Sequence, residues 1–418
     1  MSTVELTENA RKHREPKGFF RKFSNLAVKD TRFFVTGSFD VIYFILVIAL
    51  LVIGLIMMAS ASYVWGKFKA NDPMHFIKNQ AFVALVGLLA MYVVSKINPQ
   101  IFKKLAIPIS LFGLLLLVLV LFLYAPVEGK PEIKRWMAIP FTDKTFQPSD
   151  VGKVAMIIGL AWGLEKGKKL LETKMLMPMV YFLAVAGVSY LVYRESHLSA
   201  FFMFMAIGFG MIFLSGLDRR WFFFLVVVGV IAIVLFFAFR HEILNDYQNG
   251  RIDSFLKKDY TDLDGRWQTN QSLYALGSGG LFGLGIGNSK QKYMYIPEPH
   301  NDFIFAIVGE ELGFIRCVVI ILLFLALVAR GFIIAERAKS MYERLLVLGI
   351  SLQVGIQTVL NILVVTDLMF NTGISLPFFS YGGTAMLILL AEMGLVLGVS
   401  RPGSRKAILP EEKKNVKQ

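Results

Sequence analysis

The feature that most restricts what this chain can fold into is a series of apolar runs, each close to 20 residues long. Val41–Ala59, Leu105–Tyr124 and Trp221–Phe239 contain almost no charged side chains. A helix of roughly 20 apolar residues crosses the hydrocarbon core of a bilayer. The whole chain is 56% hydrophobic and 18% charged, whereas soluble domains are about 45–50% apolar and about 25% charged. The sequence therefore predicts an all-α polytopic membrane protein.

The charged interruptions between apolar runs predict about ten transmembrane helices. Their approximate limits are 40–60, 77–96, 102–124, 148–165, 174–193, 197–216, 220–240, 301–331, 344–366 and 381–400. The predicted organisation is a basic N-terminal segment (1–39), a transmembrane domain (40–400) and a tail (401–418). A large extracytoplasmic loop, 241–299, separates the seventh span from the eighth.

The distribution of basic residues predicts how these spans are oriented. One set of loops, together with both ends of the chain, is much richer in Lys and Arg than the alternate set. Because basic loops stay in the cytoplasm, both termini are expected to be cytoplasmic. This topology also explains the net charge of +14 without nucleic acid as a partner. The first apolar run starts only near Val41, later than in a secretory signal peptide, so the first span is expected to act as an uncleaved targeting signal.

Residue types that bind metals are sparse. Cys317 is the only cysteine, and the five histidines are scattered without metal-ligand spacing. This composition excludes a disulfide framework and a cysteine-based metal cluster. We therefore expect no dedicated transition-metal site.

The long outer loop is unusual in its glycine content. A loop of this length usually carries a function or has structure of its own, and glycines stand at positions 277, 279, 280, 283, 285 and 287. No Gly-Lys-Ser/Thr sequence follows, so this is not a phosphate-binding P-loop. Glycine lets a backbone approach another surface closely or bend re-entrantly. Two interpretations stay open: a loop that dips into a substrate groove, or a flexible surface loop, which the spacing alone favours.

Three carboxylates lie at the start of the eighth span, in "PEPHNDFIFAIVGEELGF" (297–314). In a helix, Glu310 lies roughly 12 Å deeper than Asp302 and about 80° around the axis, and Glu311 faces the opposite side. Asp302 is therefore expected at the outer rim and Glu310 near the middle of the membrane. Ionisable residues at that depth usually have a function, although a structural ion pair is an equal alternative for either glutamate.

A counter-charge is available in the fourth span, which starts with a favourable Pro148. Lys153 follows about one and a half turns into the membrane. A buried lysine needs a carboxylate or remains a neutral amine, and Asp302 and Glu310 are the natural partners.

Other polar residues near the outer ends of the spans are further candidates. Arg135 and Trp136 precede the fourth span, and Trp136 can equally be an interfacial anchor. Asn361 lies inside the ninth span and needs a hydrogen-bond partner. Ser380 and the glycines that follow it begin the last span, where small residues permit close helix packing.

Taken together, the motifs carry a resemblance to the SEDS family (shape, elongation, division and sporulation), which contains FtsW, RodA and SpoVE. The matching pieces are "SAS" (60–62), "RW…QPSD…K" (135–153), "QSLYALGSGGLFGLGIGNSKQK" (271–292), "IPEPHNDFIFAIVGEELGF" (296–314) and "TGISLPFFSYGG" (372–383). They occur in order along almost the whole chain, with the same number of spans. The last two pieces look closer to FtsW and SpoVE than to RodA.

The resemblance implies a peptidoglycan glycosyltransferase that polymerises lipid II at the outer face of the bacterial plasma membrane. It also implies a class B penicillin-binding protein as transpeptidase partner, among other divisome or elongasome membrane proteins. Carried over by position, Asp302 is the essential carboxylate, Lys153 its basic neighbour, and Arg135 with Trp136 a sensitive pair. The chain departs from the family pattern at Asp150, at Asn301, and in the segments 194–201 and 370–377.

For such a reaction we expect Asp302 to be the general base for the acceptor hydroxyl. Lys153 and Arg135, with Arg251 or Lys292, would offset the charge of the departing pyrophosphate, alone or with a divalent cation such as Mg²⁺ or Mn²⁺. Glu310 would hold Lys153 or another cation, and Glu311 would be structural. Further candidates for substrate contact are Trp136, Gln147, Ser149, Gln271, His300 and Ser380.

Two alternatives belong to other functional classes. One is a lipid II flippase, which needs polar groups accessible from both sides of the membrane. The other is a scaffold of the division machinery without catalysis. The clustering of the unusual residues on the outer half favours the enzyme, whereas a role in division, elongation or sporulation is left open.

Overall fold

The computed structural model describes residues 33–126, 134–139, 145–168, 177–216, 246–257 and 266–402, with isolated positions between 221 and 244. Most of the predicted N-terminal segment (1–39), of span 220–240 and of the tail (401–418) lies outside the described residues. The described part is mostly α-helical. Helices that coincide with predicted spans are α2 (Val41–Ala70), α3 (His75–Lys96), α5 (Ala106–Leu119), α6 (Pro148–Lys166), α8 (Met177–Arg194), α9 (Leu198–Leu214), α13 (Ile304–Glu336), α14 (Met341–Val365) and α15 (Gly383–Ser400).

Five of these helices, α2, α3, α13, α14 and α15, are long and apolar enough to cross a membrane, and α5, α8 and α9 are shorter apolar helices. The predicted all-α membrane class is thereby confirmed. The remaining elements are α4 (Pro99–Lys104), α11 (Asp246–Lys257), α12 (Trp267–Gly279) and an antiparallel pair of short strands, β1 (Met137–Ala138) and β2 (Thr145–Phe146).

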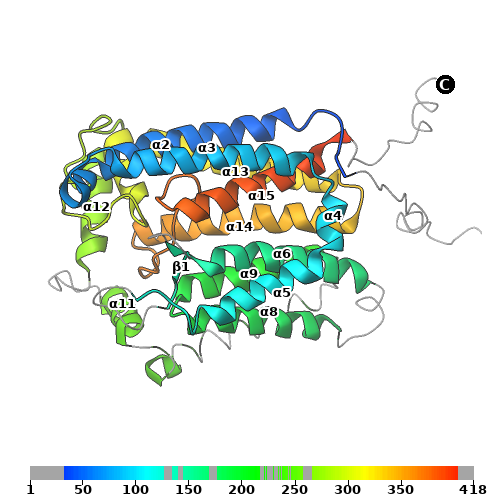
Figure 1. Cartoon of the computed structure of the whole chain (residues 1–418). Helices are drawn as coiled ribbons and strands as arrows, with labels where there is room; N and C mark the ends of the chain where they lie inside the picture. Colours follow the sequence, from blue (N-terminus) through cyan, green and yellow to red (C-terminus); the bar gives the residue numbers. More distant parts are fainter. Residues whose placement is uncertain are drawn as a thin grey trace, which may run out of the picture. The chain divides into compact units, whose positions relative to one another are not determined.

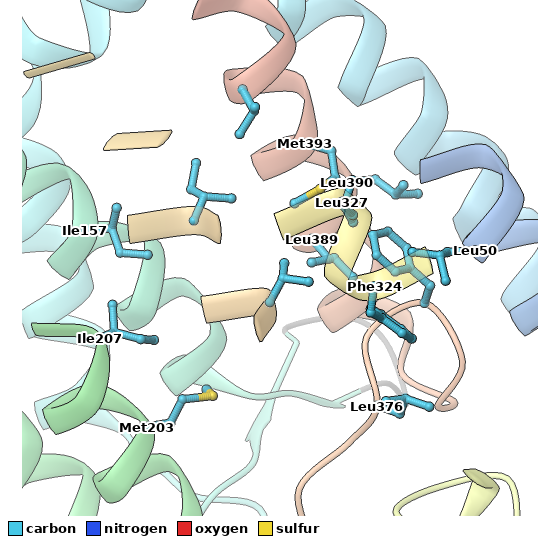
Figure 2. Close-up of a cluster of buried hydrophobic side chains, with 14 of the residues drawn as sticks. Leu50, Ile157, Met203, Ile207, Phe324, Leu327, Leu376, Leu389, Leu390 and Met393 are labelled. Atoms are coloured by element: carbon cyan, nitrogen blue, oxygen red, sulfur yellow. The ribbon is translucent and has the colours of Figure 1, made fainter. Parts of the chain in front are cut away.

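The long helices of the unit that begins at Phe34 lie side by side along a common direction, and the shorter α4 and α12 run across it (Figure 1). The most extensive contacts join α3 to α15, α5 to α6, α13 to α14, and α8 to α9. Buried apolar side chains fill the space between them. Figure 2 shows Leu50 of α2, Phe324 of α13 and Leu390 of α15 meeting in one cluster, so helices far apart in the sequence share one core.

An ion pair marks the end of the bundle that we expect to be cytoplasmic. Arg330 of α13 donates to both carboxylate oxygens of Asp40, the N-cap of α2, at 3.0 and 2.8 Å. At 1.5 Å per residue, Ser60 lies about 30 Å from Asp40, and Glu311 about 28 Å from Arg330. The hydroxyl of Ser60 donates to Glu311 at 2.7 Å, so the distances counted along α2 and along α13 are consistent with each other.

The distance between this ion pair and the two adjacent glutamates is close to the thickness of a hydrocarbon core, about 30 Å. α13, with 33 residues, is long enough to extend beyond such a core, and the position of Glu310 near the middle of the membrane stays a prediction.

The glycine-rich loop forms a re-entrant hairpin with α12. At its top, the indole nitrogen of Trp267 donates to the carbonyl of Tyr295 at 2.8 Å. The chain then descends through α12 to Gly280, whose carbonyl accepts from the amide of Phe314 at 2.9 Å, and the loop returns to the level of Trp267. The flexible surface loop, which the spacing favoured, is therefore wrong, since the segment packs closely on α13.

The close approach of loop and helix depends on glycine. α13 is broken at Gly313, where φ is 78° and ψ is 176°. The amides of Leu284 and Gly285 donate to the carbonyls of Glu310 and Glu311, each at 3.0 Å. A Cβ atom at Gly313 would lie 2.2 Å from the backbone of the loop, a distance that no real side chain tolerates. The hairpin thus replaces hydrogen bonds that the break in α13 removes.

Candidate functional site

Asp302 stands immediately before α13, in the turn that links the re-entrant loop to the helix, and is half-buried. Asn361 of α14 donates to the backbone carbonyl of Asp302 and to that of Ile374, both at 2.7 Å. The predicted need of Asn361 for a partner is thus met. Its amide ties the turn that carries the carboxylate to the loop between α14 and α15.

Two arginines from different parts of the chain converge on Asp302. The point where a Cβ of Gly373 would lie is 3.1 Å from Asp302 Oδ2, 3.8 Å from Arg251 Nη1 and 4.0 Å from Arg135 Nη1. Burial raises the pKa of Asp302 above its usual range, and the positive charges of Arg251 and Arg135 oppose that rise. The site therefore combines a carboxyl of increased basicity with two fixed positive charges, around a glycine whose φ is +70°.

Each arginine is held by a backbone carbonyl. Arg135 precedes β1 and donates through Nε, at 3.1 Å, and through Nη2 to the carbonyl of Ser196. Arg251 of α11 donates to the carbonyl of Asn371 at 3.1 Å. Trp136, next to Arg135, is 36% exposed, as expected for either an interfacial anchor or a group at the edge of the site.

Lys153 has a partner that the sequence did not predict. Its ammonium lies 2.9 Å from the carboxylate of Asp150, one turn earlier in α6, and both side chains are largely buried. The predicted pairing of Lys153 with Asp302 or Glu310 is therefore wrong. Both members of the pair line a cavity of about 40 Å³, which Gln353, Gln357 and Ser375 also line. A cavity of that size and polarity suits a few water molecules.

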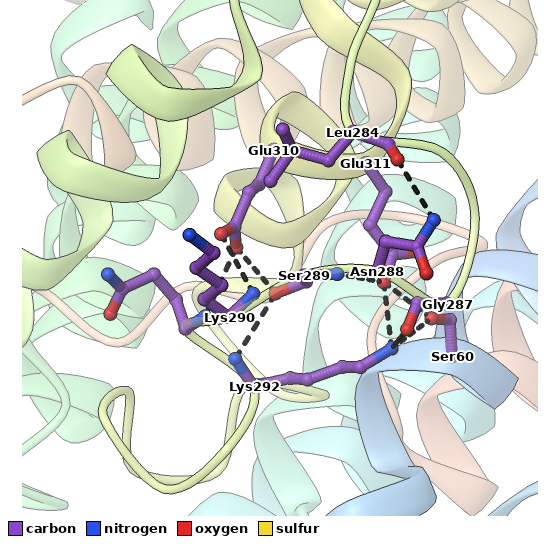
Figure 3. Close-up of polar contacts among 10 residues, drawn as sticks. Ser60, Leu284, Gly287, Asn288, Ser289, Lys290, Lys292, Glu310 and Glu311 are labelled. Atoms are coloured by element: carbon purple, nitrogen blue, oxygen red, sulfur yellow. Dashed lines mark hydrogen bonds and ion pairs between the residues drawn. The ribbon is translucent and has the colours of Figure 1, made fainter.

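The glutamates of α13 fasten the re-entrant hairpin (Figure 3). The Glu310 carboxylate accepts from the amides of Lys290 and Gln291, at 2.9 and 3.3 Å, and from the hydroxyl of Ser289. The predicted role of Glu310 in holding a cation such as Lys153 is wrong, because its partners are backbone amides and hydroxyl groups.

The neighbouring Glu311 has the structural role that was predicted for it. Its carboxylate lies 3.0 Å from the ammonium of Lys292, and that ammonium also donates to the Ser60 hydroxyl at 3.1 Å and to the carbonyl of Gly287 at 2.6 Å. Lys292 is only 3% exposed. Its predicted role as counter-charge for a pyrophosphate is therefore wrong, since the charge is already paired and buried.

Two of the predicted substrate contacts, His300 and Ser380, instead support the turn that carries Asp302. The His300 ring packs on Phe76 and Tyr381, with ring centroids 4.4 and 5.7 Å away, and burial lowers the pKa of His300 to about 4. Ser380 donates to the carbonyl of Asn301 at 2.9 Å. Both side chains are buried and orient the turn.

The remaining predicted contacts divide between the site and its surroundings. The amide nitrogen of Gln147 lies 3.0 Å from the hydroxyl of Ser149 and 2.9 Å from Nδ1 of His197. This chain of contacts joins the start of α6 to the start of α9, beside Arg135. Gln271 is buried in α12, the helix that leads into the glycine-rich loop.

Sequence reasoning missed two residues that shape the site. Gly373 lies where the three charged groups meet; it belongs to the matching piece 372–383, but the sequence predicted no role for it. Glu195 lies in the short gap between the predicted spans 174–193 and 197–216, yet it is completely buried, with 0% exposure. A carboxylate in so short a break was the signal available in the sequence.

The described part of the chain holds no group of three or more His, Cys, Asp or Glu side chains that could bind a metal ion. The charged neighbours that most affect Asp302 are arginines, which disfavour a second cation at that carboxylate.

The sequence and the fold of this chain match those of known proteins. Residues 40–405 match the family model described as "Cell cycle protein", of FtsW, RodA and SpoVE. The chain is 35% identical to the probable peptidoglycan glycosyltransferase FtsW of Trichlorobacter lovleyi, covering 88% of this chain and 94% of that protein. It is 37% identical to stage V sporulation protein E of Bacillus subtilis, covering 87% and 97%.

Two solved structures share the fold. One is a chain from a study of how a peptidoglycan synthase complex coordinates polymerization and crosslinking, with a TM-score of 0.69, 26% identity and coverage of 88% of this chain and 99% of that one. The other is the rod shape determining protein RodA of Thermus thermophilus, with a TM-score of 0.63, 25% identity and coverage of 88% and 98%. The chain therefore belongs to the FtsW/RodA/SpoVE family of cell cycle proteins.

Proposed function

We propose that this protein is a peptidoglycan glycosyltransferase that polymerises lipid II at the outer face of the plasma membrane, with Asp302 as its general base. The single observation that carries the proposal is the convergence of Arg135 and Arg251 on Asp302, around Gly373. Relatives named as probable peptidoglycan glycosyltransferases support the reaction class.

The proposed reaction joins the 4-oxygen of an acceptor GlcNAc to the anomeric carbon of a lipid-linked donor. The carboxylate of Asp302 accepts the proton of the acceptor hydroxyl as the new C–O bond forms. The bond from the anomeric carbon to the pyrophosphate oxygen breaks, and its electron pair leaves with the lipid pyrophosphate. A positioned base contributes roughly 10²–10⁴ in rate, and the raised pKa of Asp302 makes it a stronger base.

Arg135 and Arg251 are suited to stabilise the negative charge that develops on the pyrophosphate. Fixed positive groups in a water-poor site are worth more than the same groups in water, and a guanidinium can bind phosphate oxygens in pairs. Lys153 is paired with Asp150, so it would contribute to the charge balance of the cavity that these two residues line.

A divalent cation does not fit the donors of the described residues as a resident group, since these residues hold no group of three or more His, Cys, Asp or Glu side chains that could bind one, and two arginines act on the Asp302 carboxylate. We therefore propose no step that depends on a metal. Any cation would enter with the phosphates of the substrate, as Mg²⁺ often does.

A transpeptidase partner is part of the proposal. The solved relative from a peptidoglycan synthase complex is described as coordinating polymerization with crosslinking, and this chain has the same fold. We infer a class B penicillin-binding protein as the partner, within a larger division or elongation assembly. The expected location is the plasma membrane, with both termini cytoplasmic.

The test is polymerisation of labelled lipid II by the purified full-length protein in complex with its cognate transpeptidase. An inhibitor of the transpeptidase should leave glycan chains uncross-linked but still formed. Asp302→Asn should abolish chain formation while the melting temperature stays close to that of the wild type. Full polymerisation by Asp302→Asn would exclude Asp302 as the base.

Transport of lipid II is a second candidate, because buried polar groups extend deeper than Asp302. Gln353 donates to both oxygens of Glu392 at 3.0 and 2.8 Å. Ser400, at the level of Asp40, lies about 12 Å further along α15, so Glu392 belongs to the inner half. A flippase would move labelled lipid II across vesicles without making polymer, and Glu392→Gln would stop that movement.

A further inference from the structure

Glu195 stands at the corner between α8 and α9 and is fully buried. Its exposure is 0%, and neither oxygen of its carboxyl group has a hydrogen-bond partner in the described part of the chain. Removing an unpaired carboxylate from water costs far more than burying a neutral acid. This environment therefore favours a carboxyl group that keeps its proton.

The next residue in the chain connects this corner to the proposed active site. Ser196 has a φ of 59°, a left-handed backbone conformation that residues other than glycine rarely adopt. Its carbonyl accepts two hydrogen bonds from the guanidinium of Arg135. The other guanidinium nitrogen of Arg135 approaches the position beside Asp302 Oδ2. The strained corner therefore sets where the arginine stands.

The charged groups around Glu195 come from three neighbouring segments. Burial raises the pKa of Glu195 to about 9; Arg135 lowers it and Asp150 of α6 raises it. His197, at the start of α9, has its pKa held well below the usual value by burial and by Arg135 and Lys153, so it adds no charge at neutral pH. The corner thus keeps the positive charge of Arg135 available to Asp302 only while Glu195 is uncharged.

We propose that Glu195 is a positioning residue: as an uncharged acid it packs the α8–α9 corner, whose Ser196 carbonyl holds Arg135 next to Asp302. An ionised Glu195 would attract the guanidinium and compete with Asp302 for it. This inference rests on the proposed function only for its consequence in catalysis, since the protonation state and the coupling to Arg135 are properties of the folded chain.

The experiment compares Glu195→Gln with Glu195→Ala in the full-length protein with its transpeptidase, with Glu242→Gln, an exposed glutamate, as the control. At pH 7, Glu195→Gln should keep kcat and KM within about twofold of the wild type, because an amide has the shape of the neutral acid. Glu195→Ala should lower kcat at least tenfold. Above pH 9 the wild type should lose activity that Glu195→Gln retains. Equal losses of kcat in the two variants would overturn the proposal.

Two readouts do not require polymerisation. Infrared spectra of protein labelled with ¹³C-glutamate should contain a protonated-carboxyl band at pH 7 that Glu195→Gln lacks. In a double-mutant cycle of Arg135→Gln and Glu195→Ala, the changes in the free energy of unfolding should not be additive, since both substitutions act on the corner between α8 and α9. A carboxylate band from Glu195 at pH 7, or strict additivity, would refute the positioning role even if the protein proved not to be a polymerase.

A melting series against pH gives a third check with a defined sign. The unfolded pKa of glutamate is roughly 4.3, and the folded pKa of Glu195 is about 9. Between these values the folded state binds more protons than the unfolded state, so stability falls as pH rises. The melting temperature of the wild type should therefore drop relative to Glu195→Gln from about pH 5 upward. Parallel curves for the two proteins would contradict a neutral Glu195.

Discussion

Replacing Gly373 by alanine tests the arrangement of the proposed active site at the point where its charges meet. The added Cβ would lie 3.1 Å from Asp302 Oδ2, tighter than most real contacts, so the carboxylate must move by a few tenths of an ångström. The backbone there has a φ of +70°, which costs alanine about 1–2 kcal/mol in stability.

The expected loss of activity follows from the size of that displacement. A misplacement of about 1 Å in a catalytic site can cost roughly 10²-fold in rate. A shift of a few tenths of an ångström in Asp302 should therefore lower kcat roughly four- to tenfold, and Gly373→Val, with a larger side chain, about 10²-fold. KM should change less, because the displaced group acts on the reacting hydroxyl.

The matched control is Gly216→Ala. Gly216 also has a positive φ, of +96°, but nothing lies within 4 Å of its would-be Cβ. Both alanine variants should lose similar stability in thermal unfolding, whereas only Gly373→Ala should lose kcat in the lipid II polymerisation assay. A Gly373→Ala protein with the kcat of the wild type would refute the placement of Asp302 beside Gly373.

Three further outcomes follow from the described contacts. Lys292→Met should lower the free energy of unfolding by about 3–5 kcal/mol, because it leaves Glu311 as an unpaired buried charge. The double variant with Glu311→Gln should recover part of that loss in the melting curve. A double variant that is no more stable than Lys292→Met would contradict the pairing. Because the pKa of Asp302 is raised and Arg251 opposes the rise, activity should fall with decreasing pH as the base is protonated. Arg251→Gln should move the acid limb of the kcat/KM profile to higher pH, and an unmoved limb would argue against an electrostatic effect of Arg251 on Asp302. Asn361→Leu should lower both the melting temperature and kcat, since the carbonyls of Asp302 and Ile374 lose their donor at about 1–3 kcal/mol each. Unchanged values would show that these two hydrogen bonds are not needed.

Much of the fold could be predicted from the sequence, because crossing a bilayer requires long apolar helices and little else produces them. Nine predicted spans coincide with described helices, although only five of these helices are long and apolar enough to span by themselves. Pro148 begins α6 as expected. The break of α13 at Gly313 was not foreseen, since it depends on a loop that supplies the missing hydrogen bonds.

The site could be predicted only in part. Asp302, Arg135 and Arg251 were all named as candidates from the sequence, and the structure brings them together. Lys292 and Glu310 were named as well, but the structure places them in the fastening of the re-entrant hairpin. Residue type and depth select groups that can carry charge, but they do not show which opposite charge is nearest.

The sequence by itself determined that this chain is a helical membrane protein, that its polar motifs gather toward one side, and that Asp302 stands at the mouth of a span. Only the tertiary structure decided the partners: Asp150 for Lys153, Glu311 for Lys292, and the Ser196 carbonyl for Arg135. The physical reason is that helices apolar on almost every side have no polar face to set their rotation. Which side chains meet is then settled by packing between segments far apart in the chain, as at Gly373.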